Sequence, residues 1–400
     1  MLVGTKRPKI LHVGKYYPPY RGGIESHLET LCTGLSEYLD VEVVVASGSG
    51  ETLRESPNGI PVTRLASRCA IRSQSITPSL IEFIAKNDAD IVHLHLPNPW
   101  AAVAYLLSRS NSPLVITHHS DIVRQRVLKL AYAPVERVLA RKCSAFIATS
   151  QSAVDFSPVL HEHRGKCAVV PLGVAQESFL EPDQTELDRV RAEYDGPLVL
   201  SVGRLVYYKG LEYLILAMKH VPAKLLIIGT GPLEHSLRAL IRDEALTGKV
   251  ILLRDISPER LRALYHAAHV FVLPSIVKSE AFGIVQIEAM AAGCPVINTD
   301  LPSGVPFVSK HGESGITVPP RDSNAIAGAI NALLSDGALR AAYAQGARAR
   351  AARLFTAVNM VEQTLDVYRT VLSPAGKFAE DSGQLVELNL PLRADVQAIE

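Results

Sequence analysis

The feature that most constrains the fold of this chain is a regular alternation of short apolar runs with amphipathic segments. Each run spans four to six residues, is rich in Val, Ile or Leu, and is nearly continuous instead of alternating with polar residues. Strands have this composition when helices cover both faces of their sheet. Because strands and helices alternate along the chain, the pattern predicts an α/β fold with parallel, doubly wound sheets.

The apolar runs fall into two series, and each series has enough strands for a sheet of its own. The expected strands of the first series are Ile10–Gly14, Val41–Ala46, Ile91–Leu96, Leu114–His118 and Ala145–Thr149. Those of the second series are Leu198–Val202, Lys224–Ile228, Val250–Leu253, Val270–Leu273 and Pro295–Asn298. The expected helices include Glu25–Leu39, Pro78–Lys86, Leu211–Lys219, Leu233–Ala245, Pro258–Ala267 and Gly283–Ala292.

A polar, turn-rich stretch around Pro182 separates the two series. Since domains commonly have about 100–200 residues, a chain of 400 residues fits two of them. We therefore expect an N-terminal Rossmann-like domain over residues 1–176, a linker over residues 177–196, a C-terminal Rossmann-like domain over residues 197–355, a helix over residues 356–372 and a tail over residues 373–400.

Composition and charge exclude several classes of protein. The formal net charge is +1, so no overall positive field attracts nucleic acid, and we expect no such partner. The five cysteines are widely spaced and form no CxxC pair, which is typical of core residues in a reducing compartment. The N-terminus lacks the apolar region of a signal peptide, and no apolar stretch is long enough to cross a membrane. We therefore expect a cytoplasmic protein.

Glycines and charged residues follow the expected strands, at the edge where a doubly wound sheet binds its ligands. After Val202, Gly203 permits a close approach of backbone and ligand, and Arg204 and Lys209 bring two cations near the start of a helix. Arg offers a planar fork of donors and Lys a compact charge, so the pair suits a diphosphate. A solvated turn with two surface charges is the alternative.

Two carboxylates, Glu280 and Glu288, lie on either side of Gly283. If Glu280 ends a loop and Glu288 lies in the following helix, both face the cleft. Gly283 then opens that helix, whose free backbone N–H groups suit a phosphate. Glu288 stands in an apolar run, where a carboxylate needs a partner such as a ribose diol. A carboxylate on the helix surface is the alternative.

Three further loops have weaker signals. Gly22 and Gly23 lie between the first strand and the first helix, but the GxGxxG fingerprint of NAD-binding proteins is absent. His118 and His119 follow a strand and are candidates for hydrogen bonds to a sugar or a phosphate. Gly229 lies in a turn after another strand, where it approaches a ligand or caps the next helix.

Paired histidines raise the question of a metal site. His93 and His95 are two residues apart, as are His161 and His163, but neither pair has a third ligand nearby in the sequence. We therefore expect no metal ion and no cofactor.

In their order along the chain, these motifs resemble the retaining GT-B glycosyltransferases of family 4, also called group 1. The resemblance covers about residues 9–372, and its most specific part is similar to that family's E-x7-E signature. The matching segments are Gly22–Glu25, Thr117–His119, Gly203-Arg204 with Lys209-Gly210, Gly229–Pro232 and Glu280–Ala291.

The resemblance implies a role for each matching residue. Arg204 and Lys209 would bind the donor diphosphate, Glu288 would hold the ribose, and Glu280 would orient the sugar hydroxyls. His119, with His118 as the alternate, would contact the donor sugar. The other implied donor contacts are Gly22, Gly23, Gly203, Gly229, Ile256, Phe282, Gly283 and Ile284.

The resemblance also implies a GT-B fold, with two Rossmann-like domains facing across a cleft and a C-terminal helix that crosses back to the first domain. The implied reaction retains the anomeric configuration and needs no metal. The acceptor hydroxyl attacks the face from which the diphosphate departs, and the leaving phosphate takes the proton.

Two segments, Val206–Gly210 and Ile297–Pro306, are similar to bacterial mannosyl- and rhamnosyltransferases of surface-polysaccharide assembly. This similarity favours GDP-mannose as the nucleotide-sugar donor and leaves UDP-glucose and UDP-galactose open. The expected acceptor is a saccharide or a polyprenyl-linked saccharide. A basic amphipathic region also predicts peripheral contact with an anionic membrane, with a solvated helix as the alternative. Its charges are Arg124, Arg126, Lys129, Arg137, Arg141 and Lys142.

Two rival interpretations stay open at this point. One is another enzyme on the same fold, an epimerase or a phosphorylase. The other is a non-catalytic subunit that binds nucleotide sugars, although Arg204, Lys209, Glu280 and Glu288 are all present.

Overall fold

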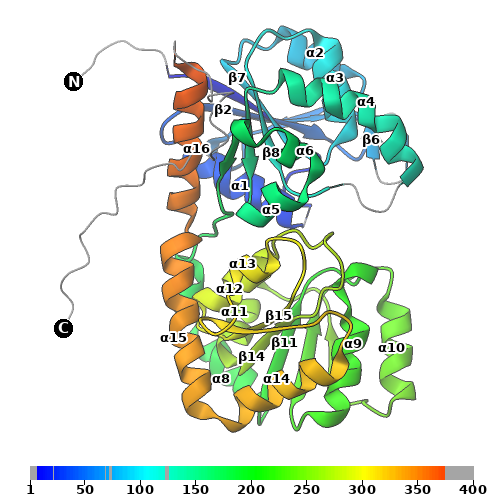
Figure 1. Cartoon of the computed structure of the whole chain (residues 1–400), viewed down its shortest axis with the longest axis vertical. Helices are drawn as coiled ribbons and strands as arrows, with labels where there is room; N and C mark the ends of the chain where they lie inside the picture. The colour runs from blue at the N-terminus through cyan, green and yellow to red at the C-terminus, as the bar shows by residue number, and fades with distance from the viewer. Residues whose placement is uncertain (1–6, 21, 68, 72–73, 122–125, 374–400) are drawn as a thin grey trace, which may run out of the picture.

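The computed structural model describes residues 7–20, 22–67, 69–71, 74–121 and 126–373 (Figure 1). They form two α/β domains stacked end to end. Two long C-terminal helices, α15 (Gly337–Leu354) and α16 (Ala357–Leu372), run along one side of both domains.

The first domain is built on an eight-stranded sheet in the order β10-β9-β8-β7-β1-β2-β4-β3. Among the described strands of this sheet all pairings are parallel except that of β3 with β4. The strands are β1 (Lys9–Val13), β2 (Asp40–Ala46), β3 (Leu53–Glu55), β4 (Val62–Leu65), β7 (Ile91–Leu96), β8 (Leu114–His118), β9 (Ala145–Ala148) and β10 (Cys167–Val169), beside an antiparallel pair, β5 (Cys69–Ile71) and β6 (Gln74–Ile76).

Helices cover both faces of this sheet. Ile10 and Ile91 point to the face covered by α1 and α16, whereas Leu11 and Val92 point to the face covered by α2, α3 and α4. This alternation explains why the strands are apolar throughout. The helices of the first domain are α1 (Gly23–Leu35), α2 (Ser79–Lys86), α3 (Pro99–Ser108), α4 (Arg126–Lys142), α5 (Gln151–Phe156) and α6 (Pro158–Glu162).

The second domain has a six-stranded parallel sheet in the order β13-β12-β11-β14-β15-β16. Its strands are β11 (Leu198–Val202), β12 (Lys224–Ile228), β13 (Val250–Leu253), β14 (Val270–Leu273), β15 (Val296–Thr299) and β16 (Gly315–Val318). Its helices are α7 (Glu177–Leu180), α8 (Gln184–Glu193), α9 (Leu211–Ala217), α10 (Glu234–Asp243), α11 (Pro258–Ala267), α12 (Ile284–Ala291), α13 (Val305–Val308), α14 (Ser323–Ser335) and α15.

Helix α16 returns from the second domain to the first, as the resemblance implied (Figure 1). It packs on α1, where a Cβ atom added to Gly34 would lie 2.5 Å from Val361 Cγ2. The glycine therefore allows the two helices to approach closely. Near the end of α16, the Tyr368 hydroxyl lies 2.6 Å from His93 Nδ1 beneath the sheet.

All ten strands expected from the sequence are confirmed, with ends that agree to within one residue. The segment expected as a linker, residues 177–196, contains α7 and α8. Leu187 and Val190 of α8 are buried in the core of the second domain. This segment therefore packs as part of that domain, although its polar composition suggested a connection between domains.

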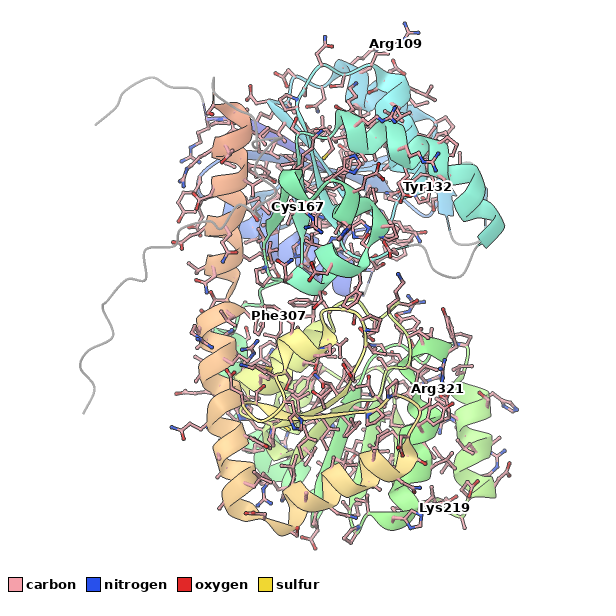
Figure 2. The ribbon with its side chains drawn as sticks, in the orientation of Figure 1. Arg109, Tyr132, Cys167, Lys219, Phe307 and Arg321 are labelled. Atoms are coloured by element: carbon pink, nitrogen blue, oxygen red, sulfur yellow. The ribbon has the colours of Figure 1, made fainter. Side chains whose placement is uncertain are left out.

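Side chains fill the space around both sheets (Figure 2). Phe307 lies at the end of the second domain that faces the first, where its ring packs against Phe282 and Phe355. Among the described helices, none is both long enough and apolar enough to span a bilayer.

Candidate functional site

The centre of the candidate site is a buried ion pair between two loops of the second domain. Lys209 ends the 3-10 turn Tyr207–Lys209 after β11, and its Nζ lies 2.6 Å from Glu280 Oε2 in the loop between β14 and α12. Both side chains are about nine-tenths buried, with exposed fractions of 10% and 9%. Ser275 Oγ donates a second hydrogen bond to the same Glu280 oxygen, at 2.9 Å. The structure thus brings together two of the residues expected in the site.

Two glycines make room beside this pair. Gly203 has φ +149°, and a Cβ atom added to it would lie 3.2 Å from Lys209 Nζ. Gly229 has φ +155°, and a Cβ atom there would lie 1.9 Å from the carbonyl oxygen of Gly203. Both residues have a positive φ that favours glycine. A Cβ atom at Gly229 would clash with the backbone, and one at Gly203 would press on the Lys209 side chain. The loops after β11 and β12 therefore meet through glycine and leave space next to the ammonium group.

Arg204 lies beside this space and is exposed. Its side chain has no hydrogen bond or ion pair with any described residue. Burial lowers the pKa of Lys15, which follows β1 in the first domain; Glu25 opposes this shift and the charge of Arg204 adds to it. Lys15 and Arg204 therefore contribute positive charge to the same region from the two domains.

The start of α12 lies close to the start of α1 in the other domain. Gly283 caps α12 with φ +76°, and Ile284 is the first residue of the helix. Gly22 caps α1, and a Cβ atom added to Gly23 would lie 3.6 Å from Ile284 Cδ1. Two helix N-termini, with their unpaired N–H groups, are therefore brought together at the domain boundary.

Glu288 lies in α12 and is partly buried, beneath the helix start. Burial raises the pKa of Glu288, and a hydrogen bond from the Tyr265 hydroxyl to Oε2, 2.6 Å long, opposes that increase. The carboxylate thus has one donor from the protein, and its other oxygen has acceptor capacity for a ligand.

The two remaining donor-side residues have different environments. Phe282 is 3% exposed and its ring packs in the domain core, so only its backbone is placed to contact a ligand. Ile256 is partly buried in the loop between β13 and α11, next to Asp255, whose φ is +52°. It packs against the hydrophobic core of the second domain.

His119 contributes from the first domain. It follows β8, is 6% exposed, and its backbone N–H donates to Leu96 O. His118 and His119 line a small cavity between the domains together with Ala281, the neighbour of Glu280. His119 therefore reaches the same boundary as the loop of Glu280.

One ion pair that the sequence did not predict crosses this boundary. Lys278 Nζ lies 2.9 Å from Asp121 Oδ2, and Asp121 Oδ1 lies 3.4 Å from His118 Nε2. Burial tends to raise the pKa of Asp121, but hydrogen bonds from His118, Lys278 and Ser157 hold it well below its usual range. The domains are thus held together by charge beside the cleft. The sequence did not predict this pair, although Asp121 ends the stretch from Thr117 that was expected to face the cleft, and Lys278 lies two residues before Glu280.

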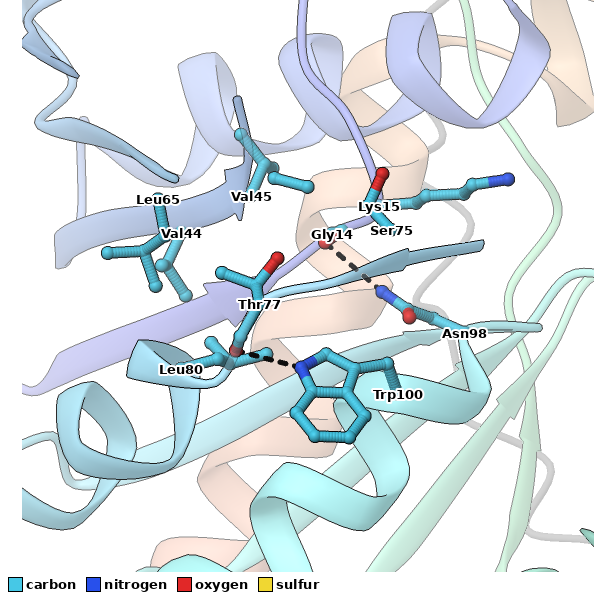
Figure 3. Close-up of a pocket in the computed structure, with 11 residues that line it drawn as sticks. Gly14, Lys15, Val44, Val45, Leu65, Ser75, Thr77, Leu80, Asn98 and Trp100 are labelled. Carbon is cyan, nitrogen blue, oxygen red and sulfur yellow. Dashed lines mark hydrogen bonds between the residues drawn. The ribbon is translucent and has the colours of Figure 1, made fainter. Parts of the chain in front are cut away.

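The first domain has a hollow of its own at the carboxyl ends of β1 and β2 (Figure 3). Its walls are mostly apolar. Asn98 Nδ2 donates to Gly14 O, and Trp100 Nε1 donates to Thr77 O. Lys15 lies at its edge. The hollow faces the side of the first domain from which ligands approach doubly wound sheets.

The proposed membrane region can be judged only in part. Arg124 and the side chains of Arg126 and Lys129 lie outside the described residues. Arg137 and Arg141 on α4 are exposed, and Val138 between them is 52% exposed.

Two family models match the chain, one for each domain. "Glycosyltransferase Family 4" matches residues 21–178, and "Glycosyl transferases group 1" matches residues 183–350.

Relatives and solved structures agree with these matches. The O-antigen chain mannosyltransferase C of Escherichia coli is 29% identical over 91% of this chain and 99% of that protein. The D-rhamnosyltransferase WbpZ of Pseudomonas aeruginosa is 30% identical over 87% of this chain and 92% of that protein. Sucrose-phosphate synthase from Thermosynechococcus elongatus has a similar fold, with a TM-score of 0.78, 24% identity, and coverage of 91% of this chain and 99% of that one.

Proposed function

Because this chain belongs to the group 1 glycosyltransferases of family 4, we propose that it transfers a hexose from a nucleotide sugar with retention of the anomeric configuration. GDP-mannose is the favoured donor. The acceptor is a hydroxyl group of a saccharide or a polyprenyl-linked saccharide in polysaccharide or lipopolysaccharide biosynthesis. The names of the O-antigen mannosyltransferase and the D-rhamnosyltransferase support this choice.

One observation carries the proposal: the buried Lys209–Glu280 pair beside a space that Gly203 keeps open. An ammonium group has three N–H donors, and the pair uses one of them. Lys209 can therefore stay bonded to Glu280 while it donates to a phosphate oxygen next to Gly203. Glu280, held by Lys209 and Ser275, then has its second oxygen left to orient the hydroxyl groups of the sugar.

The chemistry needs positive charge at the leaving group. When the anomeric C–O bond breaks, negative charge develops on the departing diphosphate, and preorganised cations and N–H groups stabilise it. Arg204, Lys209 and the N-terminus of α12 at Gly283 supply that charge in this chain. Glu288 anchors the ribose across from them.

The acceptor hydroxyl attacks the face from which the diphosphate leaves, and a phosphate oxygen takes its proton. Glu280 is then no general base, and His119 holds the donor sugar from the first domain. Because protein cations neutralise the diphosphate, we expect transfer to continue in excess EDTA. Complete loss of activity in EDTA would contradict this part of the proposal.

The decisive experiment is a donor panel with an acceptor dependence. The purified chain is incubated with GDP-mannose, GDP-rhamnose, UDP-glucose and UDP-galactose, with and without lipid-linked saccharide acceptors, and nucleotide release is measured. We expect acceptor-dependent release from GDP-mannose and the α-linked product by NMR. Release from the UDP-sugars alone would favour the second donor class. Binding of a nucleotide sugar without turnover would favour a non-catalytic subunit, and isomerisation without acceptor would favour an epimerase.

We also propose a cytoplasmic location with peripheral contact to the membrane through α4. The exposed Arg137, Val138 and Arg141 support this contact, because basic and apolar side chains together bind anionic lipid. Replacing both arginines by glutamate should reduce cosedimentation with anionic vesicles, and unchanged cosedimentation would end the membrane proposal.

A further inference from the structure

Five buried histidines gather on one face of the first sheet. His12 lies on β1, His93 and His95 on β7, His119 follows β8, and His27 lies on α1, which covers this face. The strands are neighbours in the order β8-β7-β1, and their register pairs His12 with His93. Side chains two residues apart on a strand share a face, which explains why these rings come together.

Three of the five histidines, His12, His93 and His95, have a hydrogen-bond partner at both ring nitrogens. His93 uses Nδ1 with the Tyr368 hydroxyl at 2.6 Å and Nε2 with Thr117 Oγ1 at 2.7 Å. His12 uses Nδ1 with His95 Nε2 at 3.1 Å and Nε2 with the Tyr368 hydroxyl at 3.4 Å. His93 and His12 therefore need no ligand. The Nδ1 atom of His95 instead bonds to His119 Nε2 at 3.3 Å, and a bound ion could bridge these two atoms.

His27 is different. It is 4% exposed, and neither of its ring nitrogens has a hydrogen-bond partner among the described residues. Its ring packs edge-on against His119, with centroids 4.9 Å apart, and lies 5.7 Å from the ring of His95. A buried polar group without a hydrogen-bond partner lowers the stability of the folded state by about 1–3 kcal/mol. Such groups are rare in native proteins, and they can mark a site that binds a ligand or an ion.

The electrostatics of the cluster favour neutral rings. Burial lowers the pKa of His27 to about 4 and holds the pKa values of His95 and His119 well below the usual histidine value. Neutral imidazole has the free lone pair that a metal ion requires. A cluster of neutral, crowded imidazoles is therefore preorganised as a ligand set.

We propose that His27, His95 and His119 form a binding site for a divalent transition-metal ion of the zinc type. Their ligand atoms all lie within 4.8 Å of one another. His95 Nδ1 and His119 Nε2 are 3.3 Å apart, which matches the edge of a tetrahedron with Zn–N bonds of about 2.0–2.1 Å. The ring of His27 can turn to complete the set, because no hydrogen bond from a described residue holds its nitrogens.

A second trio, His12, His93 and His95, has the same spacing, but it is a poorer site. Binding there would break the hydrogen bonds to Tyr368 and Thr117. It also lies deeper under α16, whereas His119 lines the cavity between the domains and opens the first trio to the cleft. Imidazole ligands select zinc, copper, nickel or cobalt over magnesium and calcium.

The site has a consequence that rests on the proposed function. A metal ion bonded to Nε2 of His119 would fix the orientation and the tautomer of that ring, and would so weaken its contact with the donor sugar. Zinc would then inhibit the transferase, while magnesium would not. No third ligand for His95 is visible in the sequence, because His27 and His119 lie 68 and 24 residues away from it and meet it only in the folded domain.

The test is a Co²⁺ titration of the full chain without substrates. We expect visible d–d absorption bands of tetrahedral cobalt that saturate at one equivalent and disappear when Zn²⁺ is added. The variants His27→Gln and His95→Gln should bind at least 100-fold more weakly. The control His235→Gln removes an exposed histidine on α10 and should bind like the wild type.

The variant His93→Gln separates the two trios, because His93 bonds to Tyr368 and Thr117 and not to the three proposed ligands. It should bind within about threefold of wild type, and an equal loss in His93→Gln and His27→Gln would overturn the proposal. So would wild-type protein without tetrahedral bands, a result that needs no variant to fold. Circular dichroism and thermal unfolding check each variant.

An activity measurement then tests the consequence separately. Zn²⁺ at the concentration that saturates the site should inhibit wild-type transfer at least tenfold and should spare His27→Gln, each relative to its own rate without metal. Equal inhibition of both would refute the inhibitory role. If the chain transfers no sugar at all, the proposed function fails while the cobalt titration still decides the metal site.

Discussion

Replacing Lys209 by methionine should destabilise the second domain as well as abolish transfer. Removing one partner of a buried ion pair costs about 3–5 kcal/mol, because the other charge stays buried and unpaired. Glu280 keeps its hydrogen bond from Ser275, so we expect a value near the lower end, about 3 kcal/mol. For a domain of this size, that corresponds to a decrease in the melting temperature of about 6–12 °C.

The double variant Lys209→Met with Glu280→Gln separates stability from catalysis. With both charges removed, glutamine can still accept from Ser275, and we expect most of the lost stability to return. A coupling energy of about 2 kcal/mol or more between the two positions follows. Transfer should not return, because the loss of one preorganised donor to a developing negative charge typically costs about 10²–10³ in kcat.

Differential scanning calorimetry resolves the second domain, and nucleotide release reports transfer. Lys86→Met breaks an exposed pair with Glu82, in which both side chains are more than two-thirds exposed, and should leave the melting temperature unchanged. A Lys209→Met variant as stable as wild type would refute the reasoning. So would a double variant whose loss equals the sum of the single losses.

Three further predictions concern neighbouring features. Gly203→Ala should lower kcat/KM for the donor at least tenfold, since a Cβ there lies 3.2 Å from the Lys209 ammonium. Gly248→Ala also falls on a positive φ, +82°, but has nothing within 4 Å of the added Cβ, and it should leave kcat/KM unchanged. Tyr265→Phe removes the bond that opposes the raised pKa of Glu288, so the acid limb of the pH profile of kcat/KM should move to higher pH; an unmoved limb would contradict the ribose role. Lys278→Ala should increase the radius of gyration of the ligand-free protein in X-ray scattering. It should lower the free energy of unfolding by less than about 1 kcal/mol, because the ion pair with Asp121 is partly exposed. An unchanged radius would show that this pair does not hold the domains together.

The strands at the centre of each sheet could be read from the sequence because burial on both faces leaves a continuous apolar run. β7 and β11 illustrate this, since every residue of each is apolar, His or Ser, and both were expected with the correct ends. β4 was missed because it contains Arg64 in a strand of four residues. In the fold, the Arg64 guanidinium donates hydrogen bonds to Glu55 and to the Tyr17 carbonyl, and these bonds offset the cost of burying its charge. The sequence around Arg64 does not show these partners.

The loops that form the candidate site could be predicted from the sequence, but the contacts between their side chains could not. Glycine at a strand end signals a left-handed or crowded backbone, and Gly203, Gly229 and Gly283 all have positive φ. The pairing of Lys209 with Glu280 could not be read, since 71 residues separate them and their contact depends on β11 and β14 being neighbours. The order of the motifs along the chain predicted which loops form the site. The order of the strands in the folded sheet determines which side chains of those loops are in contact.

On the face of the first sheet that α1 and α16 cover, the side chains change from apolar to polar along the strands. On β7, Ile91 at the amino end is followed on the same face by His93 and His95. On β8, Val115 is followed by Thr117, and His119 comes just after the end of the strand. The apolar residues at the amino ends of the strands pack against α16 and hold it by hydrophobic burial. The polar residues begin where the Tyr368 hydroxyl contacts His93 and His12. Since His12 bonds to His95 and His95 to His119, a continuous chain of hydrogen bonds joins the returning helix to the cleft. A displacement of α16 could therefore reach His119 through His12 and His95, two neutral imidazoles that can exchange donor and acceptor roles without taking up charge.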